Sequence, residues 1–426
     1  MPSPNRSPLQ ISRRQFLQLA SAGVSAAGIS STGLFDSLRL HADEVRKKGR
    51  ACIVVWLAGA PSQLELWDPK PGTVNGGETK AIQTSAPGIE IAHFWPEVAK
   101  QMQDVALLRT IVGKEAAHER GKYHLQTGRR LTGASRHPAL GSVVARELGD
   151  PQSDMPNFVT FGKSASAGFL GVQFAPFEID QPGALPDDVK QLVTNQRLSQ
   201  RLGMLAEQDA DFAKAGAKNL VDERQTLYER ANKMMHSSRL TSFQLTDESA
   251  KTKADYGDNR FGQGLLVARR LVEQGVPFVQ VAREGWDMHT DLYARMKKSS
   301  ADVDQGLSAL LSDLKQRGLL ESTLVVCLGE FGRTPKINSR GSNPGRDHWA
   351  RNFNALLAGA GIRGGQAVGK TSSNGQEITD RALSVEDLFQ TLCRALHIDA
   401  SKELITPEGR PLKIVDGGEP IKELFA

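Results

Sequence analysis

Glu330, Asp347 and His348 are the residues of this chain best placed to do chemistry. They lie in two neighbouring loops that follow an apolar run of strand length, residues 324–328, and Arg333 stands three residues after Glu330. In an open α/β sheet, ligands bind at the carboxyl ends of the strands. Packing does not require carboxylate, guanidinium and imidazole groups in such loops. The pattern therefore predicts a site that binds an anion, a metal ion or both.

A third loop adds an Asp-x-His pair, Asp287 and His289, directly after an apolar segment at residues 278–282. Such a pair supplies an oxygen and a nitrogen to one cation, a mixed set that suits zinc or manganese. Alone it is more often structural than functional, but three strand-end loops that offer such groups are expected to share a site. The divalent ion would be zinc, manganese or calcium. The predicted metal ligands are Asp287, His289, Glu330, Asp347 and His348.

Three further side chains are predicted to contact an anion. Arg333 and Arg346 offer planar donors suited to phosphate, sulfate or carboxylate, although each could instead be a solvated surface charge. Ser62 lies in the polar segment that follows the apolar run at residues 52–57. It could also serve as a nucleophile, but no Gly-x-Ser-x-Gly elbow surrounds it.

Alternating strands and helices must position these loops. Apolar runs of strand length occur at residues 52–57, 105–108, 278–282, 324–328 and 353–358. Helices are expected at residues 260–274, along the apolar stripe from Val303 to Leu314, and after the capping-box-like Ser384. Helices between buried strands predict an α/β fold, with a mostly parallel sheet covered on both faces. Residues 69–88 and 162–185, which are rich in Gly and Pro, are predicted to be loops.

Residues 186–238 are polar and favour helix, with breaks expected near Gly203 and Gly216. We predict a helical insertion here, serving either as a lid or edge cover or as a partner surface. The rest of the chain from residue 43 to residue 426 is predicted to form a single domain around it.

The N-terminus resembles a twin-arginine signal peptide, with the sequence Ser-Arg-Arg-Gln-Phe-Leu at residues 12–17. A weakly apolar stretch follows, and Leu40-His41-Ala42 is an acceptable cleavage site. Such signals are addresses read by the bacterial export machinery. Residues 1–42 are therefore predicted to be a signal peptide, and the protein to be periplasmic or extracellular. An ordinary helix or a membrane anchor is the alternative. No other apolar run approaches the roughly 18 residues of a membrane span.

Composition excludes some function classes. Four of the 53 Lys and Arg residues and one of the 48 Asp and Glu residues lie in residues 1–42, which leaves 49 against 47 and a net charge of +2. No basic footprint for nucleic acid is present. Three cysteines in apolar segments do not form a disulfide framework, and we expect them to be small core residues.

With these motifs in place, the chain resembles the bacterial family called domain of unknown function 1501. The resemblance rests on the N-terminal twin-arginine signal and on Gly-Ala-Pro-Ser-Gln, Trp-Asp-Pro-Lys, Trp-Asp-Met-His, Gly-Glu-Phe-Gly-Arg-Thr-Pro and Gly-Arg-Asp-His-Trp, in that order. It covers nearly the whole chain after the signal, from about residue 50 to residue 425. That family is placed with the alkaline phosphatases and sulfatases. The resemblance implies an alkaline-phosphatase-like three-layer α/β/α sandwich, but no demonstrated reaction.

The sulfatase pattern implies further roles. Its nucleophile position falls on His118 and its arginine position on Lys122, counted back from Thr127-Gly128. His118 would then attack covalently or act as a general base. Gly59-Ala60 stand where those enzymes place a metal-binding carboxylate, and Phe331 replaces a second histidine. These departures argue against a two-zinc phosphatase site and leave a one-metal site.

Three functions follow. The first is an exported hydrolase of phosphate or sulfate esters, acting on an anionic small molecule or glycan with His118 and Lys122 as catalytic residues. The second is a non-catalytic binding or assembly protein for such anions or glycans. The third is a mutase- or transferase-like activity. Fold analogy alone does not choose among them.

Overall fold

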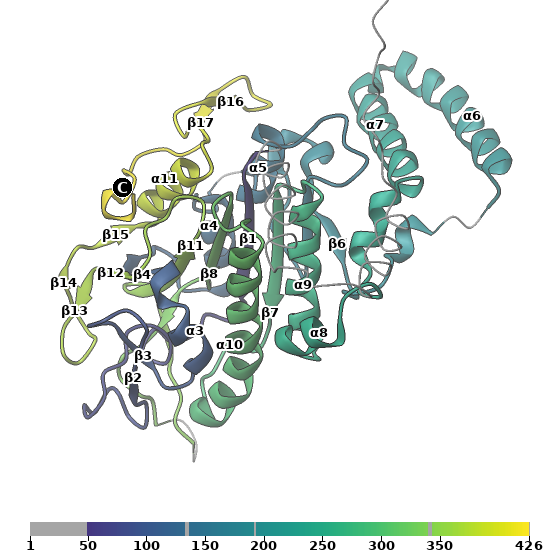
Figure 1. The fold of residues 1–426 in the computed structure, drawn as a ribbon. Coiled ribbons are helices and arrows are strands. Elements are labelled where there is room, and N and C mark those ends of the chain that lie inside the picture. The colour runs from purple at the N-terminus through teal and green to yellow at the C-terminus, as the bar shows by residue number, and fades with distance from the viewer. Residues whose placement is uncertain (1–48, 133–135, 191–192, 340–342, 426) are drawn as a thin grey trace, which may run out of the picture.

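Nine strands form the central sheet in the computed structural model, which describes residues 49–425 apart from 133–135, 191–192 and 340–342 (Figure 1). The predicted signal peptide lies outside the described residues. The order is β12-β4-β11-β8-β1-β7-β5-β6, and β15 also pairs with β4. The strands are β1 (Ala51–Leu57), β4 (Val105–Val112), β5 (Phe158–Phe161), β6 (Phe177–Ile179), β7 (Phe278–Arg283), β8 (Thr323–Leu328), β11 (Phe353–Ala358), β12 (Gln366–Val368) and β15 (Leu383–Ser384).

Helices cover both faces of this sheet, as predicted, so the architecture is a three-layer α/β/α sandwich (Figure 1). Ile53, Val55 and Leu57 of β1 pack on one face with α3, α9 and α10, and the alternate residues of β1 pack on the other face with α5 and α11. A strand buried on both sides has to be apolar throughout, which explains the unbroken run in β1. The helices are α3 (Pro96–Lys100), α4 (His118–Thr127), α5 (Leu140–Glu147), α6 (Asn195–Phe212), α7 (Lys218–Met235), α8 (Ala250–Tyr256), α9 (Arg260–Glu273), α10 (Leu292–Gln316) and α11 (Val385–Ala395).

Only β11 is antiparallel to its neighbours in this sheet, among the strands that the structure describes. The other pairings are parallel, which confirms the predicted mostly parallel sheet. Because β11 is reversed, its amino end lies at the same edge as the carboxyl ends of β8 and β4. The residues that lead into β11 therefore reach the ligand-binding edge.

Four two-stranded sheets decorate this frame. They are β2 (Ala81–Gln83) with β3 (Glu90–Ala92), β9 (Gly332–Arg333) with β10 (His348–Trp349), β13 (Lys370–Thr371) with β14 (Ile378–Asp380), and β16 (Glu403–Ile405) with β17 (Pro411–Lys413), counted within the described residues. The prediction of loops at residues 69–88 and 162–185 was wrong for β2 and for β6. The strand β6 is the edge of the central sheet, where one neighbour suffices and the apolar pattern is weak.

The helices α6 and α7 form a hairpin that stands away from the sheet (Figure 1). The chain reverses at Ala213–Ala217, where Gly216 has a φ of 101° that other residues rarely adopt. The break predicted at Gly203 was wrong, because this glycine lies inside α6.

Local signals place the remaining elements. Ser384 caps α11 in a capping box with Asp387, as the sequence pattern predicted. All three cysteines are buried and free. In the described part of the chain, every helix is either too short or too polar to span a bilayer.

Candidate metal-binding site

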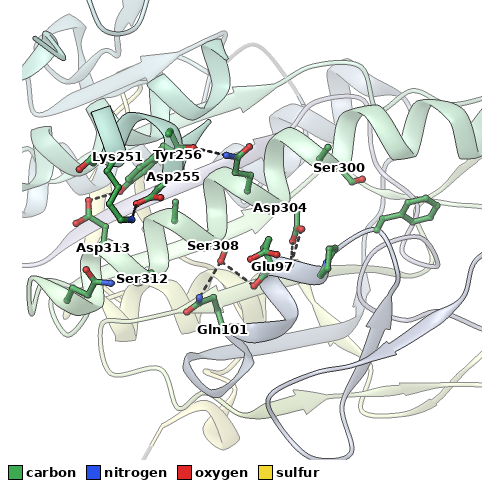
Figure 2. Close-up of a pocket in the computed structure, with 18 of the residues that line it drawn as sticks. Glu97, Gln101, Lys251, Asp255, Tyr256, Ser300, Asp304, Ser308, Ser312 and Asp313 are labelled. Carbon is green, nitrogen blue, oxygen red and sulfur yellow. Dashed lines mark hydrogen bonds and ion pairs between the residues drawn. The ribbon is translucent and has the colours of Figure 1, made fainter. Parts of the chain in front are cut away.

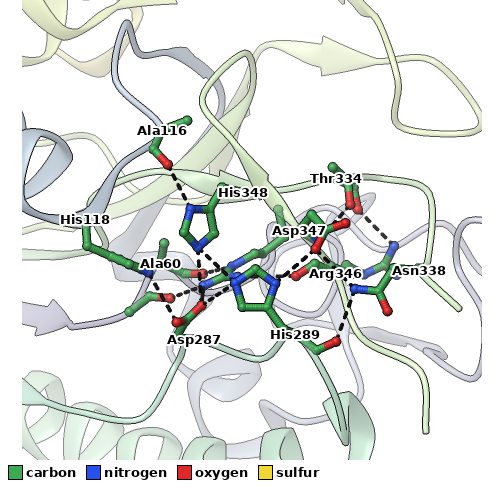
Figure 3. Close-up of polar contacts among 12 residues, drawn as sticks. Ala60, Ala116, His118, Asp287, His289, Thr334, Asn338, Arg346, Asp347 and His348 are labelled. Carbon is green, nitrogen blue, oxygen red and sulfur yellow. Dashed lines mark hydrogen bonds and ion pairs between the residues drawn. The ribbon is translucent and has the colours of Figure 1, made fainter. Parts of the chain in front are cut away.

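The carboxyl ends of β1, β7 and β8 lie at one edge of the sheet. Figure 3 shows how His118, Asp287, His289 and His348 come together there. Asp287 and His289 follow β7, and Glu330 follows β8. The short strand β10 brings His348, and the first turn of α4 brings His118. The structure thus joins loops that are more than 200 residues apart in the sequence.

Gly59 allows two of these loops to cross. It has a φ of 110°, and a Cβ atom at this position would lie 2.5 Å from the backbone nitrogen of Asp287. Its N–H donates to Oε1 of Glu330 at 3.0 Å. Gly59 therefore provides a close contact between two backbones at this edge of the sheet.

Asp287 lies at the centre of the cluster. Its Oδ1 is 3.2 Å from Nε2 of His289 and 3.4 Å from Nε2 of His348, and its Oδ2 is 3.4 Å from Nε2 of His118. Burial opposes ionisation of Asp287. The hydrogen bond and charge of Arg333, with smaller contributions from His118 and His289, outweigh burial and lower its pKa to about 2. The carboxylate is therefore ionised at neutral pH.

Each of the three histidines is anchored through Nδ1. The Nδ1–H groups donate to Oε1 of Glu330 from His118 (2.7 Å), to Oδ1 of Asp347 from His289 (3.0 Å) and to the carbonyl of Ala116 from His348 (2.8 Å). An acceptor at Nδ1 fixes the tautomer and leaves the lone pair on Nε2, as in histidines that bind metals. In the neutral form of each ring, the lone pair of Nε2 therefore points toward Asp287.

The spacing of these atoms suits a small cation. The Nε2 atoms of His289 and His348 are only 3.1 Å apart, and two lone pairs at this distance repel unless a cation or a proton lies between them. Tetrahedral zinc with bonds of about 2.0–2.1 Å places neighbouring ligand atoms about 3.3 Å apart. The ligand atoms of His118, Asp287 and His348 all lie within 4.8 Å of one another, so this set can hold a metal ion.

Charge state favours the same chemistry. Burial lowers the pKa of His348, partly opposed by its bond to the carbonyl of Ala116, so this imidazole is neutral and its Nε2 can coordinate. The hydrogen bond to Glu330 raises the pKa of His118 against the effect of burial, with help from the charges of Glu330 and Asp287. His118 is therefore the more basic of the two rings.

Glu330 and Asp347 lie behind the histidines. The side chain of Glu330 is buried, and its Oε1 is occupied by His118 and Gly59, while its Oε2 is buried without a hydrogen-bond partner among the described residues. Oδ1 of Asp347 accepts from His289 and, at 3.3 Å, from Asn338. Both carboxylates were predicted to be metal ligands, and in this structure they orient imidazoles.

The two arginines predicted to bind an anion are both buried in the protein. Arg333 donates to the carbonyls of Ala60, Gly59 and Arg346 and to Asp287, so it ties three loops to the central carboxylate. Arg346 is fully buried, and its guanidinium forms a bidentate pair with Glu65 at 2.7 and 3.0 Å. Carbonyls take its remaining donors, which corrects the expectation of a free anion-binding group.

Ser62 and Lys122 lie outside the cluster of ligand atoms. Ser62 is buried, and its hydroxyl accepts from the N–H of Leu64 at 3.3 Å. Lys122 is one turn after His118 on α4, half exposed, and its ammonium is 3.5 Å from Glu119. A flexible exposed lysine at this position can approach a ligand, whereas Ser62 cannot without a rearrangement of its turn.

The sequence interpretation missed several contributors. The carbonyl of Ala116 and the backbone of Gly59 carry no side-chain signal. Asn338 donates to both Asp347 and the carbonyl of His289, and it stands eight residues after Glu330 in a loop that we did not single out. Glu65 is a lone carboxylate between apolar residues, which is a recognisable sign of a buried pair.

A second concavity lies on the opposite side of α10 from the sheet, with a volume of about 1200 Å³ (Figure 2). Its charged groups are mostly paired with one another. Lys251 contacts Asp255 at 2.6 Å, and the hydroxyl of Tyr256 donates to Asp313. Asp304 accepts the first N–H groups of α3. This groove offers no convergence of ligand atoms comparable to that around Asp287 within the described residues.

Known structures give likenesses at low identity. A sulfatase from Pseudoalteromonas sp. is 13% identical, with a TM-score of 0.36 over 85% of this chain and 72% of that chain. A phosphonate monoester hydrolase of Agrobacterium radiobacter is 12% identical, with a TM-score of 0.38 over 88% and 77%. An alkaline phosphatase from the Antarctic bacterium TAB5 is 14% identical, with a TM-score of 0.37 over 82% and 99%. These similarities concern the overall arrangement of the chain alone, and nothing about activity follows from them.

Sequence comparison is decisive at the level of the family. No curated protein matches the chain at a significant level. A family model described as a protein of unknown function, DUF1501, matches residues 49–425, which is nearly the whole of the described structure. The chain therefore belongs to the DUF1501 family.

Proposed function

We propose that the protein is an exported, metal-dependent hydrolase of phosphate or sulfate esters. The observation that carries this proposal is the convergence of three anchored imidazoles on one ionised carboxylate. Structural ion pairs do not require three rings with matched tautomers, whereas a metal site does. Asp287, His289 and His348 would hold the ion through the triangle of atoms with edges of 3.1 to 3.4 Å. We prefer this set to that of His118, Asp287 and His348, because the pairing of His118 with Glu330 suits a base beside the ion.

Three protein ligands with an open position are typical of a catalytic zinc site. A bound divalent cation supplies Lewis-acid polarisation and neutralises charge on an anionic ester. His118 lies beside these ligands, and its Nε2 is buried without a hydrogen-bond partner among the described residues, 3.4 Å from Oδ2 of Asp287. An ester bound to the ion would then be within reach of His118.

His118 serves as the general base in this proposal. Glu330 orients the ring and makes it more basic, in the way that a carboxylate supports the base of a hydrolytic triad. In the reaction, a water oxygen bonds to phosphorus or sulfur and the ester oxygen leaves. His118 accepts the proton of the water through Nε2 and returns it to the leaving group.

The test combines metal analysis with turnover. The mature chain, purified without chelators, is assayed for bound metal and for hydrolysis of p-nitrophenyl phosphate and p-nitrophenyl sulfate. We expect close to one zinc or manganese ion per chain. His348→Ala should lose both metal and turnover, and His118→Ala should keep the metal and lose at least about 100-fold in kcat. His236→Ala, an exposed histidine on the hairpin, is the matched control.

Three outcomes contradict parts of this proposal. A folded protein without metal would overturn the metal site. Loss of metal in His118→Ala would make His118 a ligand and not the base. A stoichiometric metal without turnover of any ester would favour a non-catalytic anion- or glycan-binding protein, in which the ion itself would hold the anion.

A further inference from the structure

The α6–α7 hairpin carries most of the exposed large hydrophobic side chains that the structure describes. Met204 and Phe212 on α6 are 60% and 49% exposed, and Leu220, Leu227 and Tyr228 on α7 are 62%, 40% and 40% exposed. Two other exposed large hydrophobic residues lie elsewhere in the described chain. Such a concentration on one projecting element marks an interaction surface.

We propose that this hairpin is a homodimer interface, in which α6 and α7 pack antiparallel against the same helices of a second copy. A second copy is favoured over an unrelated partner because the hairpin is complementary to itself. A two-fold axis requires that each residue meet its symmetry counterpart, so the pattern must be balanced about a centre. Both helices meet this requirement.

On α6, the centre is Met204. Arg197 and Arg201 lie seven and three residues before it, and Glu207 and Asp211 lie three and seven residues after it. These spacings of three, four and seven place all five residues on one face of the helix. In an antiparallel pair centred on Met204, Arg197 faces Asp211 of the second copy and Arg201 faces Glu207. The two-fold axis therefore forms each of these two ion pairs twice.

On α7, the centre is Leu227. Leu220 lies seven residues before it and Met234 seven residues after it, so all three point to one side of the helix. Leu220 and Leu227 are exposed there, whereas Met234 is buried in its own chain and lines the apolar pocket at the base of the hairpin. Met204 and Leu227 also lie at nearly the same distance along their helices from the turn that joins them. Met204 is eleven residues before residue 215, the middle of the turn, and Leu227 is twelve residues after it. A single two-fold axis can therefore pass through both helices.

An apolar pocket at the base of the hairpin receives the tip of the partner. The pocket has a volume of about 320 Å³ and is lined by Phe158, Phe174 and Phe177 together with Leu227 and Met234 of α7. Antiparallel packing carries the tip of one hairpin to the base of the other. Leu220, near the tip, then lies against Met234 of the second copy and can enter this pocket.

The size of the contact is consistent with a reversible dimer. Eighteen residues give each helix a length of about 27 Å, and two helices of about 10 Å diameter present roughly 500 Å² per chain. The total of roughly 1,000 Å² before the tip contacts is close to the lower limit of about 1,200 Å² for stable interfaces. Exposed ion pairs add little energy and mainly set orientation, so the apolar residues must supply the affinity.

Charge exchange tests the two-fold arrangement. The mass of the mature chain is measured by light scattering and by sedimentation between 1 and 100 µM. We expect a dimer for the native chain and monomers for Arg197→Glu/Arg201→Glu and for Glu207→Lys/Asp211→Lys. An equal mixture of these two variants should form a heterodimer, and the chain that carries all four changes should again form a homodimer.

Apolar substitutions provide an independent arm. Leu220→Ser/Leu227→Ser should weaken the dimer at least tenfold, and Val74→Ser, an exposed hydrophobic residue far from the hairpin in the sequence, should not. All substituted side chains are exposed, and circular dichroism verifies that each variant is folded. A native chain that stays monomeric at 100 µM overturns the proposal. A dimer that ignores every charge change overturns the two-fold packing through α6.

Discussion

Glu330 illustrates how a single carboxylate acts through its neighbour. Replacement by glutamine preserves its size and removes the charge that orients His118 and raises its pKa. We predict that Glu330→Gln lowers kcat at least about tenfold while bound metal stays near the native level. Kinetics with p-nitrophenyl esters and elemental analysis of the same sample measure both. Glu119→Gln, an exposed change next to His118 on α4, is the control. Loss of the ion would show that Glu330 coordinates directly, as the sequence suggested.

Arg346 belongs to the interior. Arg346→Met leaves the fully buried carboxylate of Glu65 without its charge partner. Breaking a buried pair from one side costs about 3–5 kcal/mol, and we expect a loss of this size in the free energy of unfolding. Urea denaturation monitored by fluorescence measures it. The variant Arg346→Met/Glu65→Leu should recover part of the loss. Equal destabilisation by the double change would show that the pair itself contributes net stability.

The residue types of the site could be predicted, but their order around the centre could not. Spacing relative to strands showed that Asp287, His289, Glu330 and His348 reach one edge of a sheet. A carboxylate can either coordinate the ion or accept a hydrogen bond from Nδ1 of a histidine. The two arrangements differ by shifts of the carboxylate of about 3 Å, which the sequence pattern does not encode. The role of a backbone group such as the carbonyl of Ala116 cannot be predicted either, because every residue type carries this group.

Among the elements, Asp304 of α10 gives the short helix α3 its start (Figure 2). Burial raises the pKa of Asp304 to about 6, although the N–H groups of Val98 and Glu97 oppose the shift. A carboxyl group with a raised pKa stabilises the fold fully below its unfolded pKa of about 4, and this contribution is lost as pH rises through about 6.

We therefore predict that the stability of the native chain relative to Asp304→Asn falls by about 2 kcal/mol between pH 4.5 and pH 7. Urea titrations of both proteins at several pH values give this difference directly, and other titrating groups cancel in the comparison. A constant difference across this range would show that Asp304 titrates in the folded chain as it does in the unfolded chain.

Strand and helix positions were predictable where burial is complete. The apolar runs of β1, β7, β8 and β11 mark strands covered on both faces. The reversed direction of β11 could not be predicted from the sequence, because a strand that is buried on both faces has the same apolar pattern in either direction. The edge strand β6 was missed for the opposite reason, since a half-covered strand of three residues has too few apolar positions to stand out.

At the scale of the whole molecule, export is the prediction that lies outside the described residues. Arg13→Lys/Arg14→Lys should abolish recognition by the twin-arginine machinery and leave the full-length precursor in the cytoplasm. Fractionation and immunoblotting of the native host detect this. Arg6→Lys/Arg39→Lys, which changes the two other arginines of the segment, should be exported normally. Equal export of both variants would refute the signal.

The burial of the three cysteines has a consequence for the predicted export of the chain. Burial raises the pKa of the thiols of Cys52, Cys327 and Cys393, so each is protonated and shielded from oxidants while the fold is intact. A chain that unfolded in an oxidising compartment would expose three reactive sulfurs and become trapped by mispaired bridges. The hydrophobic core thus protects all three sulfurs from oxidation. If the export prediction holds, their oxidation state would record whether the chain folded before or after it left the reducing cytoplasm.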